Sequence, residues 1–212
     1  ILSRLPIRFN YDDNYYNQKF QGIPVDGYTA VIEKILDHPD ITVKTSQRLT
    51  AADKKNYAHM FWSGPMDSYF AYSLGRLGYR TLKFERFEAD GDFQGNPVIN
   101  YCDESVPYTR IAEHKHFAPW ETHERTVCFK EFSALCGKDD TPYYPLRLTN
   151  DKELLQRYVD LAEQESNLTF IGRLGTYRYL DMHVVIGESL DLAKRCLESS
   201  VDTWPKFSGR PI

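Results

Sequence analysis

The sequence lacks a block of basic residues, and its formal net charge is -4 at pH 7. Affinity for the phosphates of nucleic acids depends on clustered Lys and Arg, so this composition argues against a general nucleic-acid-binding protein. The sequence also lacks an apolar run of membrane-spanning length and the pattern of a secretory signal peptide. These absences predict a protein with no nucleic-acid partner and no membrane partner.

Cysteine is scarce, and no two cysteines have CxxC spacing. Four cysteines in 212 residues are too few for a secreted disulfide scaffold. We interpret Cys102, Cys128, Cys136 and Cys196 as reduced, inert thiols, which predicts a cytoplasmic location. The chain also opens on Ile1 without an initiator methionine, as expected of a fragment or of a processed chain.

No G-x-G-x-x-G sequence follows a strand-like segment, so these residues contain no complete dinucleotide-binding unit. The hydrophobic fraction of 42% is nevertheless enough for a packed core. Periodicity predicts helices over 28–38, 66–73, 151–165 (capped by Asn150 or Asp151) and 181–199, strands over 41–47, 58–63, 81–88, 97–101, 126–132 and 168–171, and a loose tail over 204–212. Because most strands are consecutive, we predict an α+β fold with a mixed, largely antiparallel sheet and packed helices.

The segment 106–117, V-P-Y-T-R-I-A-E-H-K-H-F, is polar on both faces if it is extended. One face then carries Tyr108, Arg110, Ala112, His114 and His116. This face is typical either of the wall of a polar cleft or of a solvated edge strand, and the pattern alone slightly favours the edge strand. No acidic residue accompanies the two histidines on that face, so we predict no metal site.

Arginine and tyrosine side chains gather in three short segments. Guanidinium groups donate planar, bidentate hydrogen bonds and phenols add directional neutral donors, a combination that suits a diphosphate. Taken singly, each segment is better explained by surface arginines and core tyrosines than by a binding site. The segments contain Arg4, Arg8, Tyr15 and Tyr16, then Tyr108 and Arg110, then Tyr143 and Tyr144.

The segment 172–183, G-R-L-G-T-Y-R-Y-L-D-M-H, connects a predicted strand to a predicted helix. Glycine permits close approach of a ligand, and N–H groups at the start of a helix attract an electron-rich partner. An ordinary connection with Asp181 as the N-cap explains the pattern equally well. The local sequence leaves both interpretations open.

Eight segments in order give the chain a resemblance to the bacterial type of the UDP-galactopyranose mutase family. They are R-L-P-I-R-F from Arg4, D-N-Y-Y from Asp13, F-Q-G-I-P-V-D-G-Y from Phe20, S-G-P-M-D from Ser63, F-Q-G-N-P-V-I-N-Y from Phe93, the segment from Val106, P-Y-Y-P from Pro142 and the segment from Gly172. The resemblance ends near Ser199, and residues 201–212 have no counterpart.

The resemblance implies an isomerase that interconverts UDP-galactopyranose and UDP-galactofuranose. In this family reduced FAD is thought to attack the anomeric carbon through N5 and displace UDP. The furanose sugar enters bacterial surface glycans such as lipopolysaccharide and cell-wall polymers. Members are often dimeric, so a homodimer is one assembly that the resemblance leaves open.

The resemblance also assigns roles to individual residues. Two positions match catalytic arginines: Arg110 matches the arginine that faces the diphosphate and the sugar, and Arg4 matches the arginine of the mobile loop that closes over UDP. Four positions match substrate-binding residues (Tyr15, Asn100, Tyr144 and Tyr179), although the choice of Tyr144 over Tyr143 rests on spacing. Four others match flavin-contacting residues: Gly172, Arg173, Asp181 and Met182.

The resemblance divides the chain into five regions. Residues 1–26 form the end of the mobile substrate loop and its connection, residues 27–65 return to the region of the flavin domain, and residues 66–145 form the substrate-binding mixed sheet. Residues 146–200 form the C-terminal helices with the flavin-contacting motif, and residues 201–212 form a tail. The glycine-rich unit of the family would precede Ile1. We therefore expect the chain alone to bind FAD weakly and to be inactive. Two alternatives are a related flavin-dependent oxidoreductase and a UDP-sugar-binding or remnant module without catalysis.

Overall fold

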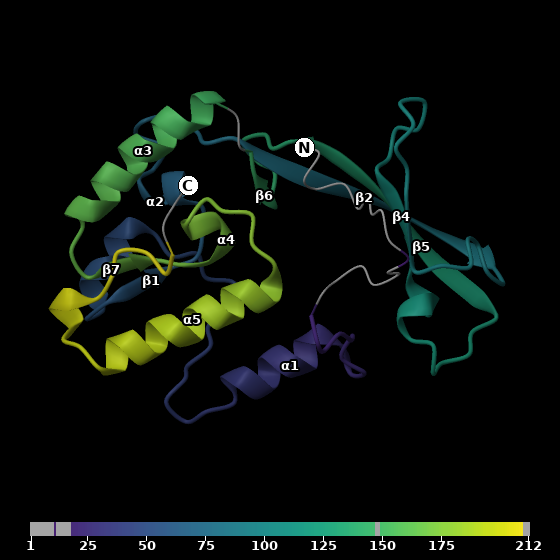
Figure 1. Ribbon diagram of the computed structural model, residues 1–212, viewed down its shortest axis with the longest axis horizontal. Helices are drawn as coiled ribbons and strands as arrows, with labels where there is room; N and C mark the ends of the chain where they lie inside the picture. The colour runs from purple at the N-terminus through teal and green to yellow at the C-terminus, as the bar shows by residue number, and fades with distance from the viewer. Residues whose placement is uncertain (1–10, 12–17, 147–148, 210–212) are drawn as a thin grey trace.

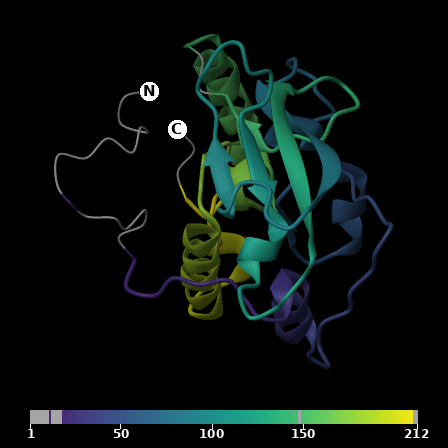
Figure 2. The ribbon, with the colours of Figure 1, turned by 90° about the vertical axis from the view of Figure 1, so that its right-hand side faces the viewer.

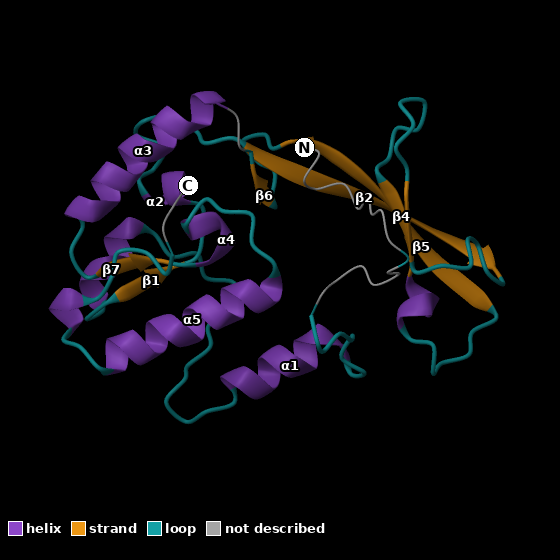
Figure 3. Cartoon of the chain, in the orientation of Figure 1, coloured by secondary structure: helices purple, strands orange, loops and turns teal. Residues whose placement is uncertain are grey.

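The structure, a computed structural model, describes residue 11, residues 18–146 and residues 149–209. The long strands extend to one end of the molecule, and most helices lie at the other end around a short pair of strands (Figure 3). One sheet has five antiparallel strands, and a second sheet is a parallel pair among the helices. The predicted α+β fold with a largely antiparallel sheet is confirmed, with the correction that the strands form two sheets.

The five-stranded sheet is built on a long ribbon of β2 (Tyr79–Asp90) and β5 (Arg125–Leu135), which extends away from the helices (Figure 1). β4 (Arg110–Glu113) pairs with the other side of β5, and β3 (Val98–Asn100) pairs with β4. β6 (Tyr144–Pro145) adds to the free side of β2. The strand order β3-β4-β5-β2-β6 therefore makes β4 an interior strand.

The helical end surrounds two short parallel strands. The elements here are β1 (Met60–Trp62), β7 (Leu168–Phe170), α2 (Met66–Tyr69), α3 (Thr149–Gln164), α4 (Gly172–Gly175) and α5 (Met182–Leu197). A further helix, α1 (Gly27–Leu36), lies at the lower end of the molecule in both views (Figures 1 and 2). Among the described residues, no helix combines the length and the apolar character needed to cross a bilayer.

The core lies where α3 packs on β7. Leu155, Tyr158 and Ala162 are spaced by three and four residues along α3, so they share one face, and they pack with Leu168 and Phe170. Each large apolar side chain buried in this way stabilises the fold by about 1.5–3 kcal/mol. The Tyr158 hydroxyl, which no solvent reaches, is satisfied by backbone groups of the α2–β2 connection.

Tyr177 joins the two ends of the molecule. Its ring is buried, and its Oη lies 2.6 Å from both Gly78 O, just before β2, and Leu146 O, just after β6. The ring also makes an edge contact with Tyr79, at 5.3 Å between ring centres. The short strand β6 is thereby held against the turn that leads from β7 to α5.

Several predicted elements differ from the structure. Residues 41–47 form no strand, since their side chains are exposed and no described strand pairs with them. The predicted helix over 66–73 is only α2, which ends at Tyr69. α3 begins at Thr149, so neither Asn150 nor Asp151 is its N-cap.

The C-terminal segment is not a loose tail over its described part. The N–H of Phe170 donates to Lys206 O (2.8 Å), and the N–H of Ser208 donates to Phe170 O (2.9 Å). The ring of Phe207 stacks on that of Phe170 with centres 5.8 Å apart. The segment binds here because β7 offers a free strand edge beside an apolar core.

Candidate functional site

Arg110, the first residue of β4, lies in a row of side chains that crosses the sheet. Asn100 on β3 and Glu131 on β5 are its direct neighbours on either side. Phe84 on β2 continues the row beyond Glu131. The interpretation of this segment as a solvated edge strand is therefore wrong, and the exposed face of Arg110 belongs to the middle of the sheet.

Glu131 holds one side of the Arg110 guanidinium. Arg110 Nε lies 3.1 Å from Glu131 Oε1, in an ion pair whose angle falls outside hydrogen-bond geometry. The Glu131 side chain is only 12% exposed, whereas that of Arg110 is 43% exposed. An ion pair this open to water contributes little to stability. Its effect is to hold one side of a guanidinium whose side chain is still partly exposed.

A shallow hollow of about 290 Å³ opens beside this pair on the same face of the sheet. Its lining is mostly apolar, with the charged pair at one side; the lining residues are Phe84, Arg110, Ala112, His114, Phe129 and Glu131. The His114 ring contacts that of Phe129, with centres 4.9 Å apart. Low local polarity strengthens the field of the Arg110 charge toward an anionic ligand.

Arg173 is the second cation of the site, and it packs against two tyrosines. Its guanidinium carbon lies 5.5 Å from the ring centre of Tyr144 and 4.9 Å from that of Tyr179. The two rings are 5.6 Å apart. Leu180 O accepts hydrogen bonds from Arg173 Nε (2.9 Å) and from one terminal nitrogen, so the guanidinium is fixed by the backbone as well.

Tyr144 connects the two arginines electrostatically. Burial raises the pKa of its phenol, and the negative charge of Glu131 and the neighbouring Tyr179 raise it further, while Arg110 and Arg173 act in the opposite direction. The net direction is upward, so Tyr144 keeps its proton at neutral pH and can donate a hydrogen bond. Both arginines therefore act on one phenol, although Arg110 lies on strand β4 and Arg173 in helix α4.

The turn after β7 requires glycine at two positions. Gly172 has a φ of 69°, in the left-handed region that favours glycine. A Cβ on Gly175 would lie 2.6 Å from Trp62 O, because α4 packs directly on the end of β1. α5 then begins at Met182, with Asp181 at the predicted N-cap position but without a side-chain cap hydrogen bond.

The structure thus places Asn100 beside Arg110 on the sheet and brings Tyr144, Arg173 and Tyr179 into contact with one another. The two groups are linked by the electrostatic effect of Arg110 on Tyr144. Gly172 is buried behind them, and Asp181 and Met182 are exposed at the start of α5. Arg4 and Tyr15 lie outside the described residues. The roles of all these residues stay predictions.

Sequence reasoning did not find three residues of this face: Glu131, Phe84 and Phe129. A signal was present for Glu131, because oppositely charged residues often face each other across paired strands. Using that signal requires the register of β4 against β5, which the sequence does not specify.

The two histidines of the 106–117 segment have different surroundings. Extended geometry ends at Glu113, and His114–Phe117 form a 3₁₀ helix. His114 stays on the face of Arg110, but His116 Nε2 lies 3.5 Å from Glu113 Oε2 and 3.7 Å from Asp92 Oδ1. The expectation that both histidines share the face of Arg110 is therefore wrong for His116.

Acidic side chains do accompany His116, contrary to the sequence argument. Asp92, Glu113 and His116 each offer a ligand atom within 4.8 Å of the others. Both carboxylates already have donors, however. The N–H groups of Phe93 and Gln94 bind Glu113, and Lys115 Nζ lies 2.8 Å from Asp92 Oδ1. The absence of a metal site remains a prediction.

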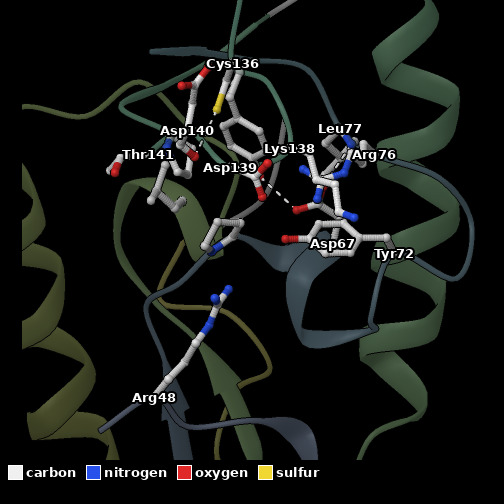
Figure 4. Close-up of a pocket in the computed structure, with 14 residues that line it drawn as sticks. Arg48, Asp67, Tyr72, Arg76, Leu77, Cys136, Lys138, Asp139, Asp140 and Thr141 are labelled. Atoms are coloured by element: carbon white, nitrogen blue, oxygen red, sulfur yellow. Dashed lines mark hydrogen bonds between the residues drawn. The ribbon is translucent and has the colours of Figure 1, made fainter. Parts of the chain in front are cut away.

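A second hollow, of about 470 Å³, lies near the start of β2 and holds none of the predicted site residues. Figure 4 shows Tyr72, Arg76 and Lys138 gathered on one side of it, with Arg48 reaching in from the other. Asp67 is buried at its wall, and burial raises the pKa of this carboxyl although Leu77 N (2.9 Å) and Ser68 N (3.0 Å) donate to it. These hydrogen bonds indicate a structural role for Asp67.

Comparison with known proteins identifies relatives over nearly the whole chain. The family model for UDP-galactopyranose mutase matches residues 1–179. A probable UDP-galactopyranose mutase of Klebsiella pneumoniae is 56% identical over 199 residues, which are 94% of this chain and 52% of that protein. The dTDP-fucopyranose mutase of Escherichia coli is 48% identical over 207 residues, covering 94% of this chain and 55% of that protein.

A solved structure described as reduced UDP-galactopyranose mutase shares the fold. Its TM-score is 0.54 at 13% sequence identity, covering 71% of this chain and 45% of that chain. The present chain spans about half the length of the curated relatives that it matches. With a family model that covers most of its residues and relatives that align along nearly all of it, this chain belongs to the UDP-galactopyranose mutase family.

Proposed function

We propose that this chain supplies the diphosphate-binding side of an enzyme that interconverts UDP-galactopyranose and UDP-galactofuranose. The observation that carries the proposal is that the charges of Arg110 and Arg173 both act on a protonated Tyr144, with the Arg173 guanidinium packed against its ring. Fixed cations and a neutral donor suit a leaving group whose negative charge grows as the bond to the sugar breaks. The furanose product would serve the synthesis of bacterial surface glycans.

In this proposal the residues of the chain position and stabilise, rather than exchange protons with the sugar. Arg110, directed by Glu131, faces the diphosphate from the sheet. Tyr144 and Tyr179 donate hydrogen bonds to it, and the Arg173 guanidinium packs against both of their rings. Correct positioning of reacting groups can contribute about 7–11 kcal/mol to catalysis in favourable cases.

The residues of the β7–α5 turn fit the FAD that the family resemblance implies. A left-handed glycine at the strand end and an α5 start without a side-chain cap leave backbone free to approach a flavin ring. Gly172, Arg173, Asp181 and Met182 would hold the cofactor there. When bound and reduced, FAD supplies the nucleophile for the anomeric carbon.

The relatives have nearly half their length outside the region that they share with this chain. We therefore propose that the 212 residues alone retain FAD weakly and do not turn over. A functional assay needs a chimera: the part of the Klebsiella pneumoniae relative that this chain does not match, followed by this chain. Under reducing conditions the chimera should convert UDP-galactofuranose to UDP-galactopyranose, as followed by chromatography of the nucleotide sugars.

A second substrate has a specific observation in its favour. The Escherichia coli relative that is 48% identical is named a dTDP-fucopyranose mutase, so a deoxysugar nucleotide is a candidate for the same site. The chimera should be assayed with UDP-galactose and with dTDP-fucose. A higher kcat/KM for UDP-galactose supports the first proposal, and a higher value for dTDP-fucose replaces it with the second. Flavin reduction with neither isomerisation would instead favour an oxidoreductase.

A further inference from the structure

The segment 178–180, which we call the clamp, holds Arg173 at two points. The N–H of Arg178 donates to Arg173 O (2.9 Å), and Leu180 O accepts hydrogen bonds from the Arg173 side chain, one of them from Nε at 2.9 Å. Between these two residues, the Tyr179 ring lies 4.9 Å from the guanidinium carbon. The direction of the Arg173 side chain therefore depends on the position of the clamp.

The clamp follows a residue with a strained backbone. Tyr177 has a φ of 50°, in the left-handed region that a bulky residue rarely adopts. Such a conformation persists only where the surrounding structure fixes it, and it is found most often at functional sites. Gly78 O and Leu146 O hold the Tyr177 hydroxyl before the clamp begins. A second fixed point is needed after Tyr177 to set the direction of the clamp.

The Arg178 side chain supplies this second point. Its two terminal nitrogens donate to the two carboxylate oxygens of Glu188 in α5, at 2.9 and 2.5 Å, and its Nε donates to Thr176 Oγ1 (3.1 Å). The hydroxyl of Thr176, a fully buried residue, donates in turn to Gly172 O (2.6 Å). The Arg178 side chain is only 11% exposed, and it joins α5 to the residues at both ends of α4.

The C-terminal segment covers the same guanidinium. A Cβ on Gly209 would lie 2.8 Å from Arg178 Cζ, so the backbone at Gly209 packs directly on the charged group. The preceding residue, Ser208, is buried and bonded to β7 through its N–H. Since α4, α5 and this segment surround the guanidinium, it has little room to turn away from Glu188.

Stability alone is a weak explanation for this pair. Taking two charges out of water costs free energy that their attraction only partly returns, and apolar residues of similar volume often stabilise a fold as well or better. What the pair does supply is geometry, because two parallel hydrogen bonds between a guanidinium and a carboxylate permit one relative orientation. Lys194 and Asp191, an exposed pair on the same helix with atoms 3.8 Å apart, impose no such orientation.

We propose that Arg178 is a positioning residue for Arg173. Its ion pair with Glu188 keeps the clamp in the place where Tyr179 and Leu180 O direct that guanidinium against the rings of the candidate site. Arg178 touches no substrate and acts only through the clamp. The fixed direction of Arg173 is a property of this chain, whereas its effect on turnover rests on the function proposed above.

Hydrogen exchange of the Arg173 side chain tests the proposal in this chain alone. The Nε–H signal of Arg173 is assigned in proton–nitrogen NMR spectra by its loss in Arg173→Lys, and its rate of exchange with water is then measured. Arg178→Met removes the pair, Glu188→Gln weakens it with less risk to folding, and Lys194→Met is the control on the same helix. Urea denaturation of each variant gives the exchange that global unfolding alone would cause, and this part is subtracted.

We expect Arg178→Met to speed exchange of the Arg173 Nε–H about tenfold, as the loss of a protecting hydrogen bond does, and Glu188→Gln to speed it about threefold. Lys194→Met should leave the rate unchanged. A mere brace would lower stability without changing the corrected rate. Unchanged exchange in Glu188→Gln would therefore overturn the proposal, even if Arg178→Met does not fold.

Turnover of the chimera defined above gives the second test. Arg178→Met should lower kcat about tenfold with a smaller change in KM, and Arg178→Lys should restore part of the loss. Adding Glu188→Gln to Arg178→Met should cost no more, because the two residues act as one unit. Unchanged kcat or additive losses would overturn the catalytic part of the proposal. A chimera that isomerises nothing would contradict the proposed function, while hydrogen exchange still decides the role of Arg178.

Discussion

Arg110 and Glu131 lie directly opposite each other on neighbouring interior strands, and Arg110 Nε lies 3.1 Å from Glu131 Oε1. Glu131 thus acts on a substrate through Arg110, which makes it a positioning residue. We predict that Glu131→Gln lowers kcat/KM of the chimera about tenfold through lost orientation of the arginine. Most of the loss should lie in kcat, and Glu131→Asp should restore part of it. A Gln variant with unchanged kinetics would show that Arg110 needs no partner.

Tyr144 and Tyr143 form a matched pair, since they are adjacent residues with different surroundings. Tyr144 lies against Tyr179 and Arg173, whereas the exposed Tyr143 contributes its backbone oxygen to Arg173. Tyr144→Phe should lower kcat/KM by about 10- to 100-fold, as expected for the loss of a donor to a charged group. Tyr143→Phe should change it less than about twofold, since it leaves the backbone oxygen in place. The reverse order of the two effects would assign the site to Tyr143.

We predict that replacing glycine with alanine has opposite effects on stability at Gly175 and at Gly187. A Cβ at Gly175 would lie 2.6 Å from Trp62 O, whereas nothing lies within 4 Å of one at Gly187 in α5. Gly175→Ala should lower the free energy of unfolding by about 1–3 kcal/mol through overpacking. Gly187→Ala should raise it by about 0.5–1 kcal/mol through helix propensity. Urea denaturation of this chain measures both, and a stable Gly175→Ala protein would contradict the close packing of α4 on β1.

The buried phenol of Tyr79 predicts a loss of stability at alkaline pH. Burial, and then the negative charge of Asp67, hold the pKa of Tyr79 well above its ordinary value of 10.0. Above about pH 10 the unfolded chain therefore releases a proton that the folded chain retains, and the free energy of unfolding falls as pH rises. Tyr79→Phe should make this fall less steep. Between about pH 7 and 8 the phenol keeps its proton in both states, so the slopes of the two proteins should agree there. If the free energy of unfolding falls equally steeply with pH above pH 10 in both proteins, Tyr79 does not contribute to the alkaline loss of stability.

Local periodicity was sufficient to predict the helices that became α1, α3 and α5, because their apolar residues recur at helical spacing. It did not show that α1 would bury none of its residues, since a helical pattern does not specify what covers the helix. The alternating pattern of 41–47 failed as a strand for a related reason: a strand needs a partner, and the described chain provides none there.

The candidate site shows the same limit: the local sequence does not specify which residues become neighbours in the fold. Arg110, Tyr144, Arg173 and Tyr179 were identified from the family resemblance, and their proximity follows from the fold. Glu131 was missed because its relation to Arg110 depends on strand register, which is a property of two segments 21 positions apart. The binding of Phe207 along β7 was missed because it depends on a free edge created by the tertiary structure.

The central claim is that Arg110 stabilises the departing diphosphate in a mutase reaction. Arg110→Ala in the chimera should cost roughly 2–4 kcal/mol of transition-state stabilisation, by analogy with lost oxyanion donors. Arg125→Ala removes an arginine at the far end of the same sheet, where it pairs with Glu88 and Asp90, and it serves as the control.

The most direct measurement is kcat/KM for conversion of UDP-galactofuranose by the chimera with reduced FAD, with flavin absorbance as the measure of cofactor binding. We predict full flavin occupancy in both variants, near-normal turnover in Arg125→Ala, and turnover reduced about 30- to 1,000-fold in Arg110→Ala. Near-normal turnover in Arg110→Ala would contradict the account.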